Sequence, residues 1–108
     1  MKTNELSGTD LDWAVARAEE QPHRIVSGLV FIPGGDNWNP SSNWAQGGPI
    51  IERERIGIEI HPGCESWISF CRGVIFTGST PLIAAMRCYV SSKLGDEVEI
   101  PEELLTTC

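Results

Sequence analysis

Residues 80–95, TPLIAAMRCYVSSKLG, constrain the fold most, because they carry the signals for both ends of one helix. Thr80 can cap the first turn, and Pro81 stands at the first helical position, where its missing N–H costs nothing. Gly95 is a typical residue to end a helix. The apolar side chains between these ends form a wide face, so we expect helix 81–94 to lie across a sheet.

Three stretches before that helix are predicted to form the sheet. Arg24 to Ile32 is mostly β-branched or aromatic, which favours one central strand with Gly28 as a bulge or close approach. Residues 55–61 alternate between apolar and polar side chains, as a half-buried strand does. Residues 66–76 are predicted to form the next strand, which pairs with 55–61 as an antiparallel hairpin.

A first helix is predicted over Leu6 to Glu20, with Thr9 as its cap and Asp12 as a weak capping-box partner. The order is then helix, strand, long central loop, two strands and helix. This order predicts an α+β fold: a small antiparallel sheet with helices on one face. We expect residues 1–95 to form a single domain and 96–108 to form an acidic tail, extended at most.

Net charge excludes one class of partner. The 108 residues carry a formal charge of −7, and the acids concentrate in the tail. Binding of duplex nucleic acid needs a basic face, so it is disfavoured. No apolar run suits a signal peptide or a membrane span, and we expect a cytoplasmic location without membrane contact.

The four cysteines stand at positions 64, 71, 88 and 108, without a Cys-x-x-Cys pair or a close Cys/His cluster. A metal site is therefore not expected. We expect free thiols, with Cys88 in the core and Cys108 exposed.

The stretch Asn37 to Arg55, NWNPSSNWAQGGPIIERER, is the predicted binding loop. Two tryptophans in a polar, glycine-containing segment must fold onto the core, cover a partner or stack on a ligand. Amide side chains add donors and acceptors, and Gly47-Gly48 permits a close backbone approach. The alternative is that both tryptophans are core residues and Gly-Gly-Pro is a turn. Residues 49–55 are compatible with either helical turns or the start of a strand.

Catalytic motifs are missing from the sequence. His23 and His61 lie in no nucleophile or metal motif, and Glu52 and Glu54 alternate with arginines as on a solvated surface. There is no phosphate-binding loop or dinucleotide fingerprint. We therefore expect a protein that is not an enzyme and needs no cofactor.

Three segments, DWAVA, NWAQGGPIIERERIGIE and TPLIAAMRCYVSSKLGDEVEIPEEL, resemble the NinX family of tailed-phage accessory proteins. At the residue before Trp44 the family commonly has Asp, whereas this chain has Asn43. The resemblance implies a phage-encoded protein of the host cytoplasm and supplies no mechanism.

Two functions follow as hypotheses. The first is non-catalytic binding of a nucleotide-type small molecule, as in sequestration of a host defence signal. Tryptophan would stack on a base, and arginines or the helix start at Thr80 would hold phosphates. The candidate ligand-binding residues are Trp38, Asn39, Asn43, Trp44, Gln46, Gly47, Gly48, Arg53, Arg55, Arg72 and Thr80.

The second hypothesis is a protein-interaction module that binds and inhibits a host or phage protein through the free sheet face and the tryptophan loop. A homo-oligomer that covers this face is also expected. Geometry separates the two ideas, because a concave pocket favours a small ligand and a flat apolar patch favours a protein.

Overall fold

A computed structural model describes residues 1–63 and 65–105 of the chain; Cys64 and Cys108 lie outside these ranges. Its elements in order are η1 (Thr3–Glu5), α1 (Gly8–Ala18), β1 (Arg24–Val26), β2 (Leu29–Phe31), α2 (Trp44–Glu54), β3 (Gly57–Ile60), β4 (Trp67–Cys71), β5 (Val74–Gly78), α3 (Pro81–Leu94) and α4 (Glu102–Leu105). None of the described helices is long and apolar enough to cross a membrane. The predicted α+β class is confirmed.

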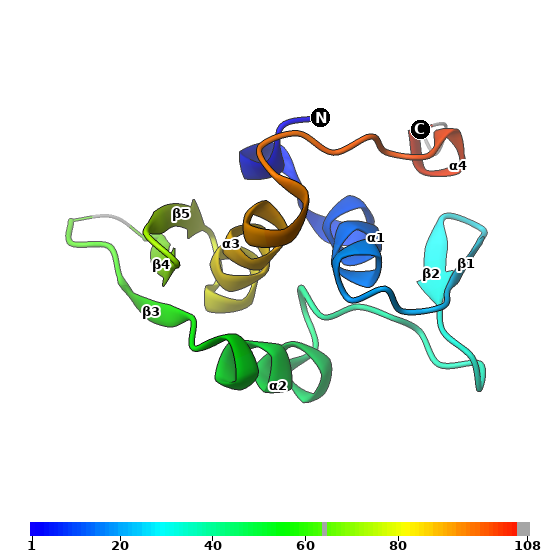
Figure 1. The fold of residues 1–108 in the computed structure, drawn as a ribbon, viewed down its shortest axis with the longest axis horizontal. Helices are drawn as coiled ribbons and strands as arrows, with labels where there is room; N and C mark the ends of the chain where they lie inside the picture. The colour runs from blue at the N-terminus through cyan, green and yellow to red at the C-terminus, as the bar shows by residue number, and fades with distance from the viewer. Residues whose placement is uncertain (64, 106–108) are drawn as a thin grey trace.

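Helix α3 lies at the centre of the molecule, between the three-stranded sheet on one side and α1 on the other, with α2 beneath (Figure 1). Thr80 caps it as predicted, since its Oγ1 accepts a hydrogen bond of 3.1 Å from the Ile83 N–H. Pro81 begins the helix and Gly95 ends it. Seven of its side chains are buried: Leu82, Ala84, Ala85, Met86, Cys88, Tyr89 and Val90. The predicted core position of Cys88 is confirmed.

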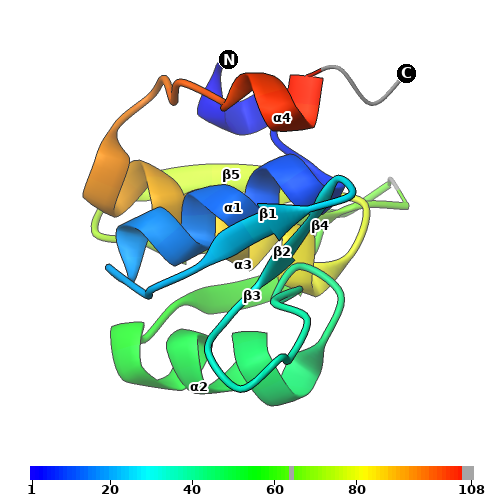
Figure 2. The same cartoon turned by 90° about the vertical axis from the view of Figure 1, so that its right-hand side faces the viewer.

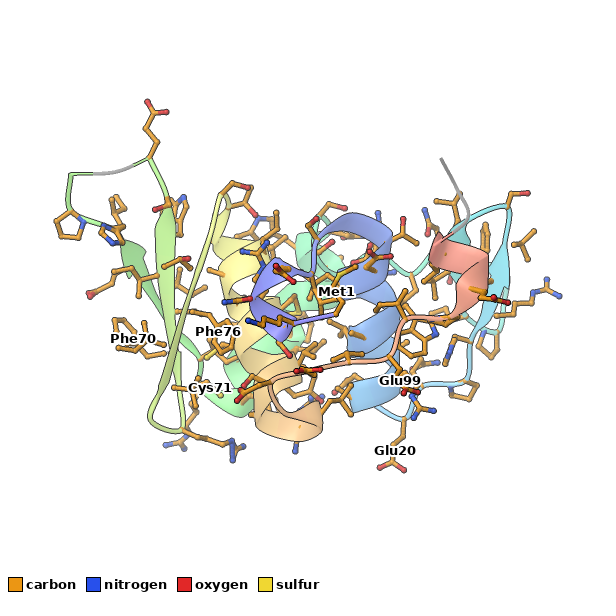
Figure 3. The ribbon with its side chains drawn as sticks, turned by 90° about the horizontal axis from the view of Figure 1, so that it is seen from above. Met1, Glu20, Phe70, Cys71, Phe76 and Glu99 are labelled. Carbon is orange, nitrogen blue, oxygen red and sulfur yellow. The ribbon has the colours of Figure 1, made fainter. Side chains whose placement is uncertain are left out.

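The sheet on α3 consists of β3, β4 and β5 in antiparallel order, and its strand content differs from the prediction. Residues 66–76 are not one strand, because Arg72 and Gly73 adopt positive φ values of 50° and 81° in a two-residue turn between β4 and β5. Both residues with positive φ define a type I′ turn, whose twist suits a hairpin. Figure 3 shows Cys71 and Phe76 turned toward α3 and Phe70 turned away from it.

The predicted central strand 24–32 is also two strands, and it does not join that sheet. Ser27 and Gly28 have φ values of 52° and 76° and form a second type I′ turn, so Gly28 is a turn residue and not a bulge. The β1–β2 hairpin lies against α1, on the side away from the three-stranded sheet (Figures 1 and 2).

The central loop is shorter than predicted, because residues 44–54 form helix α2. Asn43 caps it, since its side-chain oxygen accepts a 2.9 Å hydrogen bond from the Ala45 N–H. Pro49 lies inside the helix rather than at its start. Gly47 is buried where α2 meets its neighbours, and a Cβ there would lie 2.6 Å from both the Leu82 Cδ2 and the Pro40 carbonyl oxygen.

Both ends of the chain differ from the prediction. Helix α1 begins at Gly8, so Thr9 is a helical residue and not the cap. The tail is not simply extended, because it includes α4, and Val98 and Leu104 belong to the hydrophobic core. The Met1 amino group donates a 2.8 Å hydrogen bond to the Val98 carbonyl, which fastens the tail to the N-terminus.

Two adjacent glycines test how α2 packs. Gly47→Ala should lower the free energy of unfolding by about 1–3 kcal/mol, because the new Cβ overlaps a backbone oxygen and Leu82. Gly48→Ala is the matched control: its Cβ has Trp44 Cε3 at 3.9 Å as nearest neighbour, so the gain in helix propensity should stabilise by about 0.5–1 kcal/mol. Urea unfolding of both variants measures the difference. Equal stability of the two variants would contradict this packing.

Candidate functional site

The segment from Asp36 to Asn43 runs beside β2 and is held by backbone hydrogen bonds and by the side-chain amide of Gln46. The Trp38 N–H donates to the Val30 carbonyl at 2.7 Å. Gln46 reaches back from α2: its Oε1 accepts from the Asn39 N–H at 2.7 Å, and its Nε2 donates to the Asn37 carbonyl at 2.9 Å. These bonds order the segment without a ligand, so the cavity beside it is preformed.

That cavity has a volume of about 320 Å³ and lies between the start of α1, strand β2, this segment and the start of α3. Its volume falls in the range of about 300–1,000 Å³ that small-molecule sites occupy. It is lined by Gly8, Thr9, Asp12, Leu29, Val30, Asn37, Trp38, Asn39, Ser41, Ser42 and Ile83. We call it the Asp12–Trp38 pocket.

Asp12 is buried, with 6% of its surface exposed, and its Oδ1 accepts a 2.8 Å hydrogen bond from the Ser41 N–H. None of the ion pairs found among the described residues includes this carboxylate. Burial raises its pKa to about 6, although hydrogen bonds from the Ser41 hydroxyl and the Ser41 backbone N–H act in the opposite direction. The pocket therefore contains a carboxylate that titrates near neutral pH and has no cation beside it.

Trp38 contributes a second unmatched group. Its ring belongs to the hydrophobic core and 8% of its surface is exposed, so the ring is placed as the core alternative anticipated. Its indole N–H, however, is buried and has no hydrogen-bond partner among the described residues. An unmade buried hydrogen bond costs about 1–3 kcal/mol, and such groups in native proteins call for an explanation.

The other predicted residues at the start of α2 do not line the pocket. Trp44 is 55% exposed and does not line the pocket. Asn43 caps the helix, Gln46 fastens the segment, and Gly47 allows close packing. Of the predicted residues, only Trp38 and Asn39 line the pocket, while Thr80 caps the helix whose Ile83 does so.

The predicted phosphate-binding arginines do not line the pocket, and two of them, Arg53 near the end of α2 and Arg72 in the β4–β5 turn, pair with carboxylates. Arg53 binds Glu19 with both terminal nitrogens, and its Nε lies 2.9 Å from Glu54. Arg72 contacts the same Glu54 at 2.7 Å. Hydrogen bonding by Arg53 is the largest cause that lowers the pKa of Glu54. Arg55 takes a left-handed conformation at the C-cap, with an exposed side chain. The structure does not bring Trp38, Trp44 and these arginines together.

The sequence reasoning missed Asp12 as a site residue. It predicted Asp12 as a weak capping-box partner of Thr9, but Asp12 precedes Val15 and Ala16 by three and four positions. Both of those residues are fully buried, so Asp12 shares a buried helical face. An acid on the apolar face of a helix was the available signal.

Two further groups bear on chemistry. Burial raises the pKa of the Cys88 thiol to about 11, which keeps it protonated and a poor nucleophile at neutral pH. Among residues 1–63 and 65–105, no three His, Cys, Asp or Glu side chains gather in a way that could hold a metal ion.

Residues 2–93 of the chain match the family described as Bacteriophage P22, NinX. The chain belongs to this family. The match includes every strand, both α1 and α2, and every residue that lines the pocket. The resemblance drawn from the sequence is confirmed, and the chain is a phage accessory protein. A comparison with curated proteins found no match.

The buried carboxylate makes a pH-dependent prediction. The pKa of Asp12 is higher in the folded chain than in the unfolded one, so the folded state binds the proton more tightly. Its stabilising contribution is complete below about pH 4 and is lost as the pH rises through about 6. Asp12→Asn keeps an acceptor for the Ser41 N–H and abolishes this titration. Relative to the parent, the free energy of unfolding of this variant should rise by up to about 3 kcal/mol as the pH goes from 4 to 7.5.

Urea unfolding of parent and variant across that pH range measures the gain. Asp10→Asn, at a less buried acid in the same turn, is the control and should show a much smaller change. A stability difference between parent and Asp12→Asn that stays constant with pH would contradict the burial of this carboxylate.

Proposed function

We propose that this phage protein is a non-catalytic binder of a nucleotide-type small molecule, which it holds in the Asp12–Trp38 pocket and so sequesters in the host cytoplasm. The observation that carries the proposal is the Asp12–Trp38 pocket, whose lining includes a buried carboxylate without an ion-pair partner among the described residues. Trp38 also lines this pocket, and its indole N–H is buried without an acceptor among those residues. A ligand bound at the pocket could supply the partner that a buried polar group lacks.

The lining supports the base and sugar of such a molecule. The pocket that Asp12 lines is also lined by the apolar residues Leu29 and Ile83 and by residues with hydroxyl or amide side chains: Thr9, Ser41, Ser42, Asn37 and Asn39. Small-ligand sites combine apolar walls with a few placed polar groups in this way. The proposal rests on this lining and not on the arginines of α2, which carboxylates engage.

A non-catalytic role is supported by the state of the nucleophile candidates. The Cys88 thiol is buried in the core, and its pKa is raised to about 11. The Nδ1 of His23 lies 2.8 Å from the Gln21 carbonyl, and that of His61 lies 3.1 Å from the Pro62 carbonyl. Neither histidine lines the pocket. Sequestration requires only that the protein binds the molecule, and it needs neither a nucleophile nor a general base.

The test is native mass spectrometry of tagged protein isolated from infected host cells, under gentle and then denaturing conditions. We expect the parent to release a small molecule and Trp38→Phe to retain up to about tenfold less of it, because one hydrogen bond from the indole N–H is lost. The unfolding midpoint of this variant should stay near that of the parent, since removing an unmatched N–H offsets the smaller ring.

Trp44→Phe is the matched control, because Trp44 is exposed and outside the pocket. It should retain the molecule. Parent protein that is always empty, or equal retention by Trp38→Phe and the parent, would refute small-molecule binding at this pocket.

The second candidate is a protein-interaction module that binds and inhibits a host or phage protein, and the expected homo-oligomer would use the same surface, the outer face of the three-stranded sheet. Phe70 turns away from α3 (Figure 3), and Ile75, its partner in the register, is 64% exposed. The register places Ile68 and Glu59 on the same face. This face carries one acid among apolar side chains, whereas the chain as a whole has a net charge of −7. Two copies of the chain would therefore repel each other less through this face than through the rest of their surface.

Sedimentation equilibrium tests this second candidate. The parent should form a dimer, and Ile75→Lys should be monomeric, because two buried lysines would face each other near the two-fold axis. Val26→Lys, at a 45% exposed residue of the β1–β2 hairpin, should remain dimeric. A monomeric parent would refute self-association through this face, and a host protein captured by the parent and lost with Ile75→Lys would replace the second copy as occupant.

A further inference from the structure

The carboxylate of Asp12 has unused acceptor capacity. An ionised carboxylate offers about four lone-pair sites on its two oxygens. Ser41 uses part of this capacity, because its backbone N–H donates to Oδ1 and its hydroxyl also hydrogen-bonds the carboxylate. Asp12 lines the pocket, so its remaining lone-pair sites are available to a ligand there. Because Asp12 is buried, a negative charge without a partner is costly at this position. A ligand group that donates hydrogen bonds would remove that cost.

The arginines that form ion pairs or hydrogen bonds elsewhere in the structure do not supply this donor. Arg53 and Arg72 pair with Glu19 and Glu54, and Arg87 donates to the carbonyls of Leu6 at 2.7 Å and Thr77 at 2.8 Å. No lysine, arginine or histidine lines the Asp12–Trp38 pocket. Asp10 stands in the same helical turn and adds negative charge. A phosphate or carboxylate placed against Asp12 would therefore be repelled.

We infer that the pocket binds a ligand with two neighbouring N–H donors, which form two parallel hydrogen bonds to the Asp12 carboxylate. The guanidinium group has this geometry, and so does the N1–H and 2-amino edge of a guanine. Paired donors match the two oxygens of one carboxylate, and bonds to a charged acceptor are stronger than neutral ones. The indole N–H of Trp38 is a donor and suits an acceptor elsewhere on the same ligand.

This inference rests on the proposed function, and it narrows the ligand from any nucleotide-type molecule to one with a donor–donor edge. It places the uncharged base in the pocket and leaves any phosphate outside it. Of the candidate bases, guanine presents such an edge and hypoxanthine lacks its 2-amino group. Guanosine and inosine therefore differ in the one group that the inference requires.

Isothermal titration of the full chain with guanosine, inosine and methylguanidinium tests the inference. Guanosine should bind the parent about tenfold or more tightly than inosine, the effect of one hydrogen bond to a charged group. Asp12→Asn should lose that preference and weaken guanosine binding by a similar factor. Asp10→Asn is the matched control, because it removes the same charge two residues away, and it should change affinity less than about threefold.

Methylguanidinium identifies the source of the donors. Competition between methylguanidinium and guanosine would assign the site to guanidinium groups as well as guanine, whereas binding of guanosine alone would assign it to the base. Equal affinity for guanosine and inosine, unchanged guanosine binding by Asp12→Asn, or no binding of either guanosine or methylguanidinium would each overturn the inference.

Failure here can be distinguished from failure of the proposed function. If the parent releases a cell-derived molecule of which Trp38→Phe retains less, small-molecule binding stands even when the donor–donor edge is refuted. If the parent carries no molecule and binds none of the three probes, both proposals fall together.

Discussion

The burial of α3 is the constraint on which the rest of the structure depends. The inner face of the sheet packs on one side of it, α1 on another and α2 beneath. Polar ties add direction to this packing: the Ser69 hydroxyl donates to the Ala84 carbonyl at 2.6 Å, and Arg87 joins the carbonyls of Leu6 and Thr77. Because α1 packs on α3 and β2 packs on α1, the walls of the Asp12–Trp38 pocket are fixed relative to one another.

The elements with strong local signals were predictable, and those chosen by packing were not. A cap, a first-turn proline and a terminal glycine located α3 almost to the residue. The two type I′ turns were missed because Ser27-Gly28 and Arg72-Gly73 lie within runs of strand formers and lack the more usual Asn-Gly or Asp-Gly pair. Gly47-Gly48-Pro49 argued against a helix locally, yet the absent side chain at Gly47 is what lets α2 approach Leu82.

The candidate site was predicted in part, for a related physical reason. Composition located the segment around Trp38 but could not tell a buried ring from an exposed one. In the structure Trp38 is buried and Trp44 is exposed. The arginines suggested phosphate binding, but their partners, Glu19 and Glu54, are set by tertiary contacts that a linear pattern does not contain. Asp12 could be recognised as a site residue only from the tertiary structure, in which the Ser41 N–H donates a hydrogen bond to its carboxylate. A pocket made by four elements is a property of the fold, and its chemistry has to be read from the structure.

The central claim is that a small molecule satisfies the buried indole N–H of Trp38. The most direct measurement is the set of tryptophan indole resonances in a ¹⁵N–¹H NMR spectrum, with Trp38→Phe and Trp44→Phe for assignment, before and after addition of a small-molecule extract of infected host cells. The account predicts that the Trp38 signal shifts and gains protection from hydrogen exchange, while the exposed Trp44 signal stays in place. A shift of the Trp44 signal with an unchanged Trp38 signal would contradict it.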